Sequence, residues 1–268
     1  MTSAASTRPE KRLVGMVHLP PLPGSPQSAL ELSAIEERAV REAQILARAG
    51  FDSCLLENFG DVPFHKERVD PITVATMTRI VASVRRELPD LHLGVNVLRN
   101  DALAALAVAL AGGANAIRVN VHVGATATDQ GVVEGRAAET LRTRRALAAA
   151  IDIWADVHVK HGSSLAHDTI IEEARDAAER GLADALIVTG KATGWKTEVD
   201  DLRAVRELEL GVPIYVGSGV HERNVDLFLR ESDGVIVGSS LKEEGRAAKP
   251  LDPERVERFM EVARHPSI

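Results

Sequence analysis

The chain has 268 residues, of which 45% are hydrophobic and 26% are charged, which is the composition of a globular protein. Its formal net charge is −7 and it contains no long basic run. This argues against a nucleic-acid-binding protein, because phosphate neutralisation needs clustered Lys and Arg. Cys54 is the only cysteine, so a disulfide framework is excluded and a reducing, cytoplasmic location is expected.

The first twelve residues, MTSAASTRPEKR, lack the apolar core of a secretory signal. The Ala-rich stretch 101–114 is too short to cross a bilayer, so we expect no integral membrane segment. We interpret residues 1–11 as a flexible tail and residues 12–268 as a single domain, because no linker or low-complexity segment divides them.

Short apolar runs alternate with longer stretches of helical periodicity along the whole chain. Strands that alternate with crossover helices predict a parallel sheet, and eight such units predict a (β/α)8 barrel, a TIM barrel. An open doubly wound sheet is the alternative, but no dinucleotide-binding fingerprint follows the first run. The expected strands are 12–18, 52–58, 91–98, 116–123, 152–160, 185–190, 213–219 and 234–240.

Polar side chains alternate with valines near the carboxyl ends of the fourth and fifth expected strands. They are Arg118 and Asn120 in the fourth strand and Asp156, His158 and Lys160 in the fifth. In a sheet covered by helices neither face is freely solvated, so charged groups pointing into the barrel are expected to be paired or in use. A solvated amphipathic strand is the alternative.

Other expected strands end in polar residues at the same level: His18 in the first, Glu57 and Asn58 in the second, and Asn96 in the third. Neighbouring charges push pKa values apart, so this mixture can perform acid–base chemistry. We predict a catalytic set made of His18, Glu57, Asp156, His158 and Lys160. We predict that Asn58, Asn96, Arg118 and Asn120 bind the substrate.

Two residues of the catalytic set allow several roles. Lys160 could be an electrostatic clamp, a base or a Schiff-base nucleophile, and the clamp is the simplest interpretation. Asp156 and His158 are two residues apart on one strand and would share a face. They could therefore hold a divalent metal ion, although no metal-spacing motif is present. No other cofactor is implied.

Two glycine-rich turns follow the last two expected strands. They are Gly217-Ser218-Gly219 and Gly238-Ser239-Ser240. Glycines let backbone N–H groups approach an anion closely, and in (β/α)8 barrels the phosphate site is commonly built from the loops after strands seven and eight. The pair predicts a phosphate-binding site, whereas tight turns without a ligand are the alternative.

Three further loops are expected to border the mouth. Thr189 opens a Gly- and Thr-rich loop after the sixth expected strand, which could be a mobile cover. Asp129 and Glu134 lie in the long fourth loop and could reach over the substrate. Residues 19–26 contain four prolines after His18, and we interpret them as a stiff wall, because proline fixes φ and lacks an N–H donor.

Several long segments together resemble the BtpA family. They include GMVHLPPLPGSP, ENFGDVPF, LGVNVLRND, IRVNVHVGATATDQGVVEGRAAE, ADVHVKH, GLADALIVTGKATG, VGSGVHERNV and DGVIVGSSLK. The resemblance spans about residues 12–262 and implies a barrel of the ribulose-phosphate-binding group. It also implies a link to photosystem I biogenesis or to sugar metabolism, and it assigns no catalytic roles. His122 departs from the uncharged residue common in relatives, so we leave it out of the site.

Two functions follow. The first is an enzyme acting on a small phosphorylated sugar or nucleoside-derived metabolite by acid–base or metal-assisted chemistry, as a lyase, isomerase or hydrolase. The second is a non-enzymatic assembly factor for a membrane protein complex, which the family resemblance alone suggests. The expected partner is a phosphorylated small molecule rather than a nucleic acid, and the chain could form a homo-oligomer.

Overall fold

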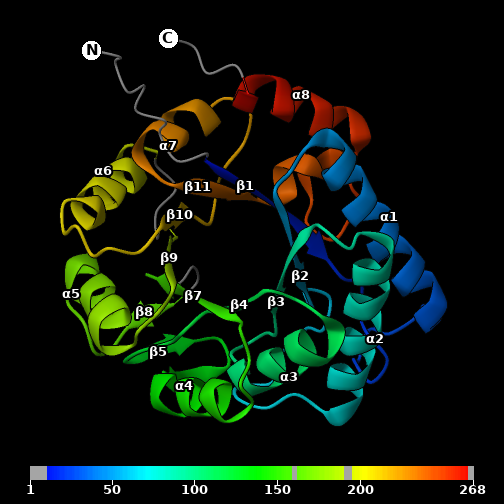
Figure 1. Cartoon of the computed structure of the whole chain (residues 1–268), viewed down its shortest axis with the longest axis horizontal. Coiled ribbons are helices and arrows are strands. Elements are labelled where there is room, and N and C mark those ends of the chain that lie inside the picture. Colours follow the sequence, from blue (N-terminus) through cyan, green and yellow to red (C-terminus); the bar gives the residue numbers. More distant parts are fainter. Residues whose placement is uncertain (1–10, 159–161, 190–194, 265–268) are drawn as a thin grey trace, which may run out of the picture.

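The structure, a computed structural model of the chain, describes residues 11–158, 162–189 and 195–264 (Figure 1). Eight parallel strands form a closed barrel, in which β1 pairs with both β2 and β11. This confirms the predicted (β/α)8 class. The barrel strands are β1 (Arg12–His18), β2 (Ser53–Glu57), β3 (His92–Asn96), β4 (Ala116–Val119), β7 (Asp152–Val157), β9 (Ala185–Val188), β10 (Ile214–Val216) and β11 (Gly234–Val237).

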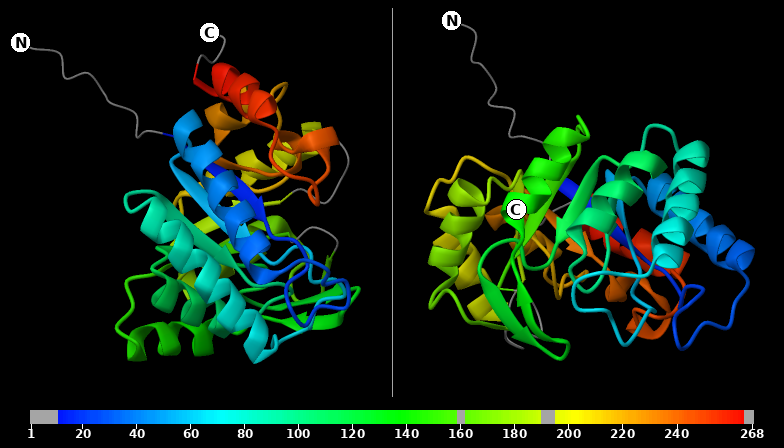
Figure 2. Two further views of the ribbon diagram at one scale, coloured as in Figure 1. Left: turned by 90° about the vertical axis from the view of Figure 1, so that its right-hand side faces the viewer. Right: turned by 90° about the horizontal axis from the view of Figure 1, so that it is seen from below.

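Helices follow the barrel strands and surround them (Figures 1 and 2). They are α1 (Leu32–Ala49), α2 (Pro71–Glu87), α3 (Ala102–Gly112), α4 (Ala137–Ala146), α5 (Ile170–Arg175), α6 (Trp195–Arg206), α7 (Val225–Glu231) and α8 (Pro253–Arg264). Helix α5 continues as a π-helical turn, η1 (Asp176–Arg180), and two 3-10 turns, η2 (Ser239–Leu241) and η3 (Glu243–Gly245), follow β11. None of the helices in the described ranges is long and apolar enough to cross a membrane.

A small second sheet was not predicted. It consists of β5 (Ala125–Thr128), β6 (Gly131–Glu134) and β8 (Ser163–Ser164), which pair in antiparallel fashion in the order β6-β5-β8. Accordingly β4 ends at Val119 and β7 at Val157, earlier than the expected 116–123 and 152–160. The hairpin stands on the same side of the barrel as the loop between β1 and α1 (Figure 2).

The hydrophobic core has two parts that follow from strand alternation. Aliphatic side chains fill the layer between the strands and the helices. A separate cluster fills the inside of the barrel and contains Val14, Met16, Leu55, Ala116, Trp154, Ala185, Ile187, Tyr215 and Ile236. With aromatic residues at only 3% of the chain, Val, Leu, Ile and Ala supply most of both parts.

Trp154 is the large side chain inside the barrel and it makes three ring contacts. The ring of His92 stacks on it with centroids 5.5 Å apart, Tyr215 meets it edge-on at 5.3 Å, and the Arg12 guanidinium lies 5.8 Å from its centroid. Arg12 and His92 are the first residues of β1 and β3, and Tyr215 is the middle residue of the short strand β10. The amino-terminal side of the barrel is therefore filled by packing.

We predict that Trp154→Ala lowers the free energy of unfolding by about 3–5 kcal/mol, because the barrel interior cannot collapse around the lost ring. Leu110→Ala, at a half-exposed position on α3, should change it by less than about 1 kcal/mol. Urea denaturation followed by circular dichroism measures both. Equal effects would show that the interior cluster does not carry the stability assigned to it.

Candidate active site

At the carboxyl ends of the strands the barrel interior changes from apolar to polar. Each barrel strand carries a polar residue or a glycine on its inner face, at or directly beside its carboxyl end. These residues are His18, Glu57, Asn96, Arg118, Asp156, Thr189, Gly217 and Gly238. The register places neighbours side by side, with His18 opposite Glu57, Glu57 opposite Asn96, and Asn96 opposite Arg118.

A buried ion pair lies at the centre of this layer. Arg118 donates from Nε to Asp156 Oδ1 at 2.9 Å and from Nη2 to Oδ2 at 3.1 Å, and their side chains are only 10% and 1% exposed. Asn120 Nδ2 donates to Asp156 Oδ2 at 2.7 Å. Burial lowers the pKa of Arg118, but the Asp156 carboxylate outweighs it and the net pKa is raised. The guanidinium is therefore charged and held in one orientation.

Two of the three asparagines predicted to bind substrate, Asn58 and Asn96, differ in their surroundings. Asn96 Nδ2 donates to the Arg118 carbonyl at 2.9 Å and to Asn120 Oδ1 at 3.1 Å. Its own Oδ1 is buried and accepts no hydrogen bond from the described residues. Asn58 is used inside the protein, because it accepts from the Leu98 N–H at 2.7 Å and donates to Asp61 at 3.1 Å. Asn58 thus braces two loops, and Asn96 keeps an acceptor for a ligand.

His18 and Glu57 are neighbours at the mouth, and the pKa values of both are shifted. His18 Nε2 lies 3.8 Å from Glu57 Oε1, and the Phe59 ring packs against the imidazole with centroids 4.8 Å apart. Burial raises the pKa of Glu57 to about 7, with Arg118 opposing this effect. Burial and then Lys242 lower the pKa of His18 to about 3. At neutral pH the imidazole is neutral and the carboxyl is divided between both protonation states.

The two glycine turns approach these charged groups closely. A Cβ atom added at Gly238 would lie 3.0 Å from His18 Cε1, and one added at Gly217 would lie 2.2 Å from Ile187 Cγ2 and 3.5 Å from Arg118 Nη2. Gly219 has a φ of +70°, in the left-handed region that favours glycine. Larger residues would therefore separate the turns from the barrel interior.

Side-chain hydrogen bonds hold the two turns together. Ser240 donates to the Val220 carbonyl at 2.7 Å and so joins the turn after β11 to the loop after β10. Asn224 donates to the Gly219 carbonyl at 2.9 Å and accepts from the His221 N–H at 2.8 Å. Ser218 lies within the first turn, and Ser239 begins the 3-10 turn η2. The backbone of the predicted phosphate site is thus fixed from outside.

The proline-rich segment after β1 is tied to the loop after β2. The Leu22 N–H donates to Asp61 Oδ1 at 2.8 Å, and a Cβ atom at Gly60 would lie 2.3 Å from the Pro21 nitrogen. Gly60 also donates its N–H to the Leu19 carbonyl at 3.0 Å. The segment therefore packs against the loop after β2, and its role as a stiff wall stays a prediction.

His158 does not continue the strand alternation. Its φ is +56°, which turns the chain after Val157, and its Nε2 lies 3.8 Å from Glu173 Oε2 on α5. Asp156 meanwhile pairs with Arg118, so the expected shared face of Asp156 and His158 does not form. Among the described residues no group of three His, Cys, Asp or Glu side chains is arranged to hold a metal ion. The residues present do not fit the metal site considered above.

The remaining predicted residues fall into three situations. Thr189 lies at the mouth and donates to the His158 carbonyl at 2.8 Å, bracing the turn after β7. Asp129 and Glu134 are exposed on the β5–β6 hairpin, where Asp129 accepts from Gln130. Lys160 lies outside the described residues, and so do residues 190–194 of the predicted loop cover.

Sequence reasoning missed a buried charged cluster behind the turn after β11. The Lys242 side chain is fully buried and donates to Glu42 Oε2 on α1, while Arg38 donates to Glu42 Oε1 at 2.9 Å. Glu42 also accepts from the Leu251 N–H at 3.3 Å. In the sequence Lys242 belongs to a charged stretch, LKEEGR, that resembles a surface loop, so no local signal distinguished it.

The comparisons with known proteins identify the family of the chain. The sequence profile of the BtpA family matches residues 9–265. The chain belongs to the BtpA family. It is 46% identical over 250 residues to the photosystem I biogenesis protein BtpA of Synechocystis, covering 93% of this chain and 87% of that protein. It is 34% identical to an uncharacterized mitochondrial protein of Caenorhabditis elegans, covering 95% and 93%.

Solved structures similar to this BtpA-family chain are TIM barrels. Thiamine phosphate pyrophosphorylase of Pyrococcus furiosus superposes with a TM-score of 0.57 at 16% identity, covering 96% of this chain and 97% of the other. Phosphoribosyl anthranilate isomerase of Thermococcus kodakaraensis superposes with a TM-score of 0.56 at 15% identity, covering 94% and 99%. At these identities the likeness shows the fold.

The raised pKa of Glu57 makes the stability of this BtpA-family barrel depend on pH. Between the ordinary value of 4.5 and about 7 the folded chain keeps a proton that the unfolded chain releases. The free energy of unfolding therefore falls as pH rises through this range. For each pH we compare the free energy of unfolding of Glu57→Gln with that of the native protein. We predict that this difference favours the variant by up to about 3 kcal/mol more at pH 8 than at pH 4.

Urea denaturation of both proteins at pH 4 and pH 8 measures this difference. Both proteins contain His18, so its contribution to the pH dependence is common to the two. Glu87→Gln, at the exposed end of α2, is the matched control, because it makes the same chemical change at a carboxyl group that is not buried. If Glu57→Gln shows the same stability change at both pH values, the carboxyl is not held protonated by the fold.

Proposed function

We propose that this BtpA-family protein is an enzyme that acts on a small phosphorylated sugar or nucleoside-derived metabolite by acid–base chemistry. The observation that carries the proposal is the close approach of the glycine turns to polar inner-face residues of the barrel. Gly238 lies against His18 and Gly217 beside Arg118. The Gly217 N–H donates to the Val188 carbonyl at 3.0 Å, so a phosphate group would bind the backbone N–H groups that follow the two glycines, and the rest of the molecule would lie over Glu57.

Glu57 is suited to move a proton at neutral pH. Its pKa of about 7 means that the carboxylate is present to accept a proton and the acid form is present to return it. In the reaction class we favour, Glu57 takes a proton from a carbon next to a carbonyl group, and the electron pair of that C–H bond moves toward the carbonyl oxygen. Return of the proton to a neighbouring carbon gives an isomer. In an aldol-type lyase Glu57 would instead take the proton of a hydroxyl group on the β carbon: the O–H electron pair forms a new C=O bond, the bond between the α and β carbons breaks, and its electron pair moves toward the first carbonyl oxygen as an enolate, which then takes up a proton.

Arg118 and His18 would support the charge that develops on the oxygen. Arg118 is charged and fixed by two hydrogen bonds to Asp156, so it needs no reorganisation when negative charge forms beside it. His18 is neutral and acts as a hydrogen-bonding group rather than as a cation. Lys160 stays a predicted catalytic residue of this site, and Ser218, Gly219, Ser239 and Ser240 stay predicted phosphate-binding residues.

Two similar barrels bear names that include phosphorylated compounds, thiamine phosphate pyrophosphorylase and phosphoribosyl anthranilate isomerase. This supports the phosphate assignment by analogy of fold. The hairpin residues Asp129 and Glu134 stand at the same side of the barrel and would contact only a ligand that extends beyond the mouth.

We predict that inorganic phosphate and at least one sugar phosphate raise the melting temperature of the protein, because a ligand that binds only the folded state stabilises it. Gly238→Ala should abolish most of this increase, since its methyl group would occupy the space beside His18. Thermal denaturation with and without each compound measures the effect, and the melting temperature without ligand checks that the variant folds. If neither phosphate nor any sugar phosphate has an effect, the phosphate site is wrong.

The name of the Synechocystis relative motivates a second candidate, a factor for assembly of a membrane protein complex. A relative in a nematode, an organism without photosystems, shows that a role tied to photosystem I alone would not cover the family. A factor that only binds another protein also has no use for a barrel mouth rich in charged groups, which are costly to bury.

We predict that Glu57→Gln and Asp156→Asn abolish the biological activity while the protein stays folded. Complementation of a strain lacking this protein, with circular dichroism of the purified variants, measures both properties. Full complementation by folded variants would favour the assembly role over the enzyme.

A further inference from the structure

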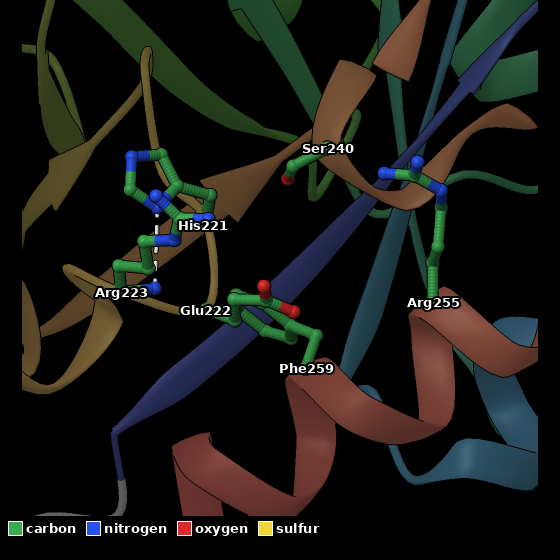
Figure 3. Close-up of a pocket in the computed structure, with 6 residues that line it drawn as sticks. All are labelled: His221, Glu222, Arg223, Ser240, Arg255 and Phe259. Atoms are coloured by element: carbon green, nitrogen blue, oxygen red, sulfur yellow. Dashed lines mark hydrogen bonds between the residues drawn. The ribbon is translucent and has the colours of Figure 1, made fainter. Parts of the chain in front are cut away.

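A cavity lined mainly by polar and charged side chains adjoins the predicted phosphate turn at Ser240. It has a volume of about 270 Å³ and is lined by residues of three elements, the loop after β10, the turn after β11, and α8. The lining residues are His221, Glu222, Arg223, Ser240, Arg255 and Phe259. Figure 3 shows the loop residues on one side of the space, α8 with Arg255 and Phe259 on the other, and Ser240 between them.

We propose that this cavity is a second anion subsite that takes a phosphate group. The inference rests on the proposed function, because Ser240 belongs both to this cavity and to the predicted phosphate turn Gly238–Ser240. A group bound here would be the neighbour of the phosphate held by the two glycine turns. The substrate class would then be a metabolite with two phosphate groups, or a phosphorylated metabolite used together with inorganic phosphate.

The charge of the lining favours an anion. Two guanidinium groups, from Arg223 and Arg255, come from elements far apart in the sequence, and one carboxylate, from Glu222, opposes them. Within the described part of the chain Arg223 forms no ion pair, whereas Arg255 Nε lies 3.4 Å from Asp252. Arginine presents several N–H donors in a planar fork that matches phosphate, and an unpaired guanidinium is the group that gains most from an anion.

The framework of the cavity is preformed. Arg223 donates its backbone N–H to His221 Nδ1 at 3.2 Å, which fixes the loop that carries both side chains (Figure 3). Asn224 braces the same loop internally, and Ser240 joins it to the turn after β11. Phe259 is buried and supplies the apolar part of the cavity lining, whose other side chains are polar. The backbone of the loop is therefore fixed before a ligand binds, and the ligand would have to order only the exposed side chains of Glu222 and Arg223.

The test is isothermal titration calorimetry of the full chain with inorganic phosphate, fructose 6-phosphate and fructose 1,6-bisphosphate. The proteins are the native chain, Arg223→Gln, Arg255→Gln and Arg258→Gln. Arg258 lies on α8 one turn from Arg255, pairs with Glu254 and does not line the cavity, so it is the matched charge control. Gly238→Ala reports separately on the first phosphate site.

We expect the bisphosphate to bind at least tenfold more tightly than the monophosphate, and Arg255→Gln or Arg223→Gln to remove about tenfold of this advantage. Monophosphate affinity should stay within about twofold of the native value. Glu222→Gln should strengthen bisphosphate binding, because it removes the opposing charge. If the second subsite instead takes free inorganic phosphate, two phosphate ions bind per native chain and the bisphosphate binds no more tightly than the monophosphate. Arg255→Gln then binds only one phosphate ion.

Two results would overturn the proposal. If one phosphate binds per chain, is lost in Gly238→Ala and is unaffected by both arginine variants, the second subsite is wrong and the proposed function stands. If no compound binds to any of the proteins, the second subsite and the phosphate assignment of the proposed function fail together.

Discussion

The buried ion pair between Arg118 and Asp156 is the interaction on which the mouth of the barrel depends. A charge inside a closed barrel cannot keep its hydration shell, so it is tolerated only with a partner of opposite charge and with further hydrogen bonds. Asp156 receives three such bonds, two from Arg118 and one from Asn120, and Asn96 extends the network to the backbone of β4. Removing either ion would leave the other unpaired in the same place.

The same pair defines the chemistry available to Glu57. Arg118 lowers and Asp156 raises the pKa of this carboxyl, so the two partners act in opposite directions, and burial dominates. The result is a carboxyl group that titrates near neutral pH, beside a histidine that burial keeps neutral. A lone arginine would instead have stabilised the carboxylate and reduced its ability to return a proton. The neutralisation of Arg118 by Asp156 therefore also helps to keep the pKa of Glu57 near neutral pH, as the proposed acid–base role requires.

Much of this arrangement was predictable from the sequence, because strand alternation is a property of the backbone. Arg118, Asn120 and Asp156 were expected on one inner face, and their hydrogen bonds show that they meet. The expectation failed at His158, where a φ of +56° ends the alternation and turns the side chain toward Glu173. Alternation cannot indicate where a strand stops, and no residue type in VHVKHG marks that position. The hairpin 125–134 was likewise hidden, since its short strands look like a Gly- and Thr-rich loop.

Lys242 illustrates the opposite difficulty. A lysine beside two glutamates predicts an exposed loop, yet its partner Glu42 lies 200 residues away on α1. Only the closure of the barrel, which brings β11 beside β1, places these elements together. The site residues that sequence analysis can find are those set by local periodicity, whereas those set by closure need the fold.

The two ends of the barrel solve the same packing problem in different ways. At the amino-terminal side Trp154 fills the interior and packs against His92, Arg12 and Tyr215, so side chains alone fill this end of the barrel. At the carboxyl-terminal side, glycines replace large side chains at positions 217 and 238, and the polar groups around them are braced by other parts of the chain. Glycine at these positions keeps free the space beside Ile187 and His18 that a Cβ atom would occupy. For the proposed function, the absence of a side chain at these two positions is what would let a charged ligand reach Arg118, His18 and Glu57.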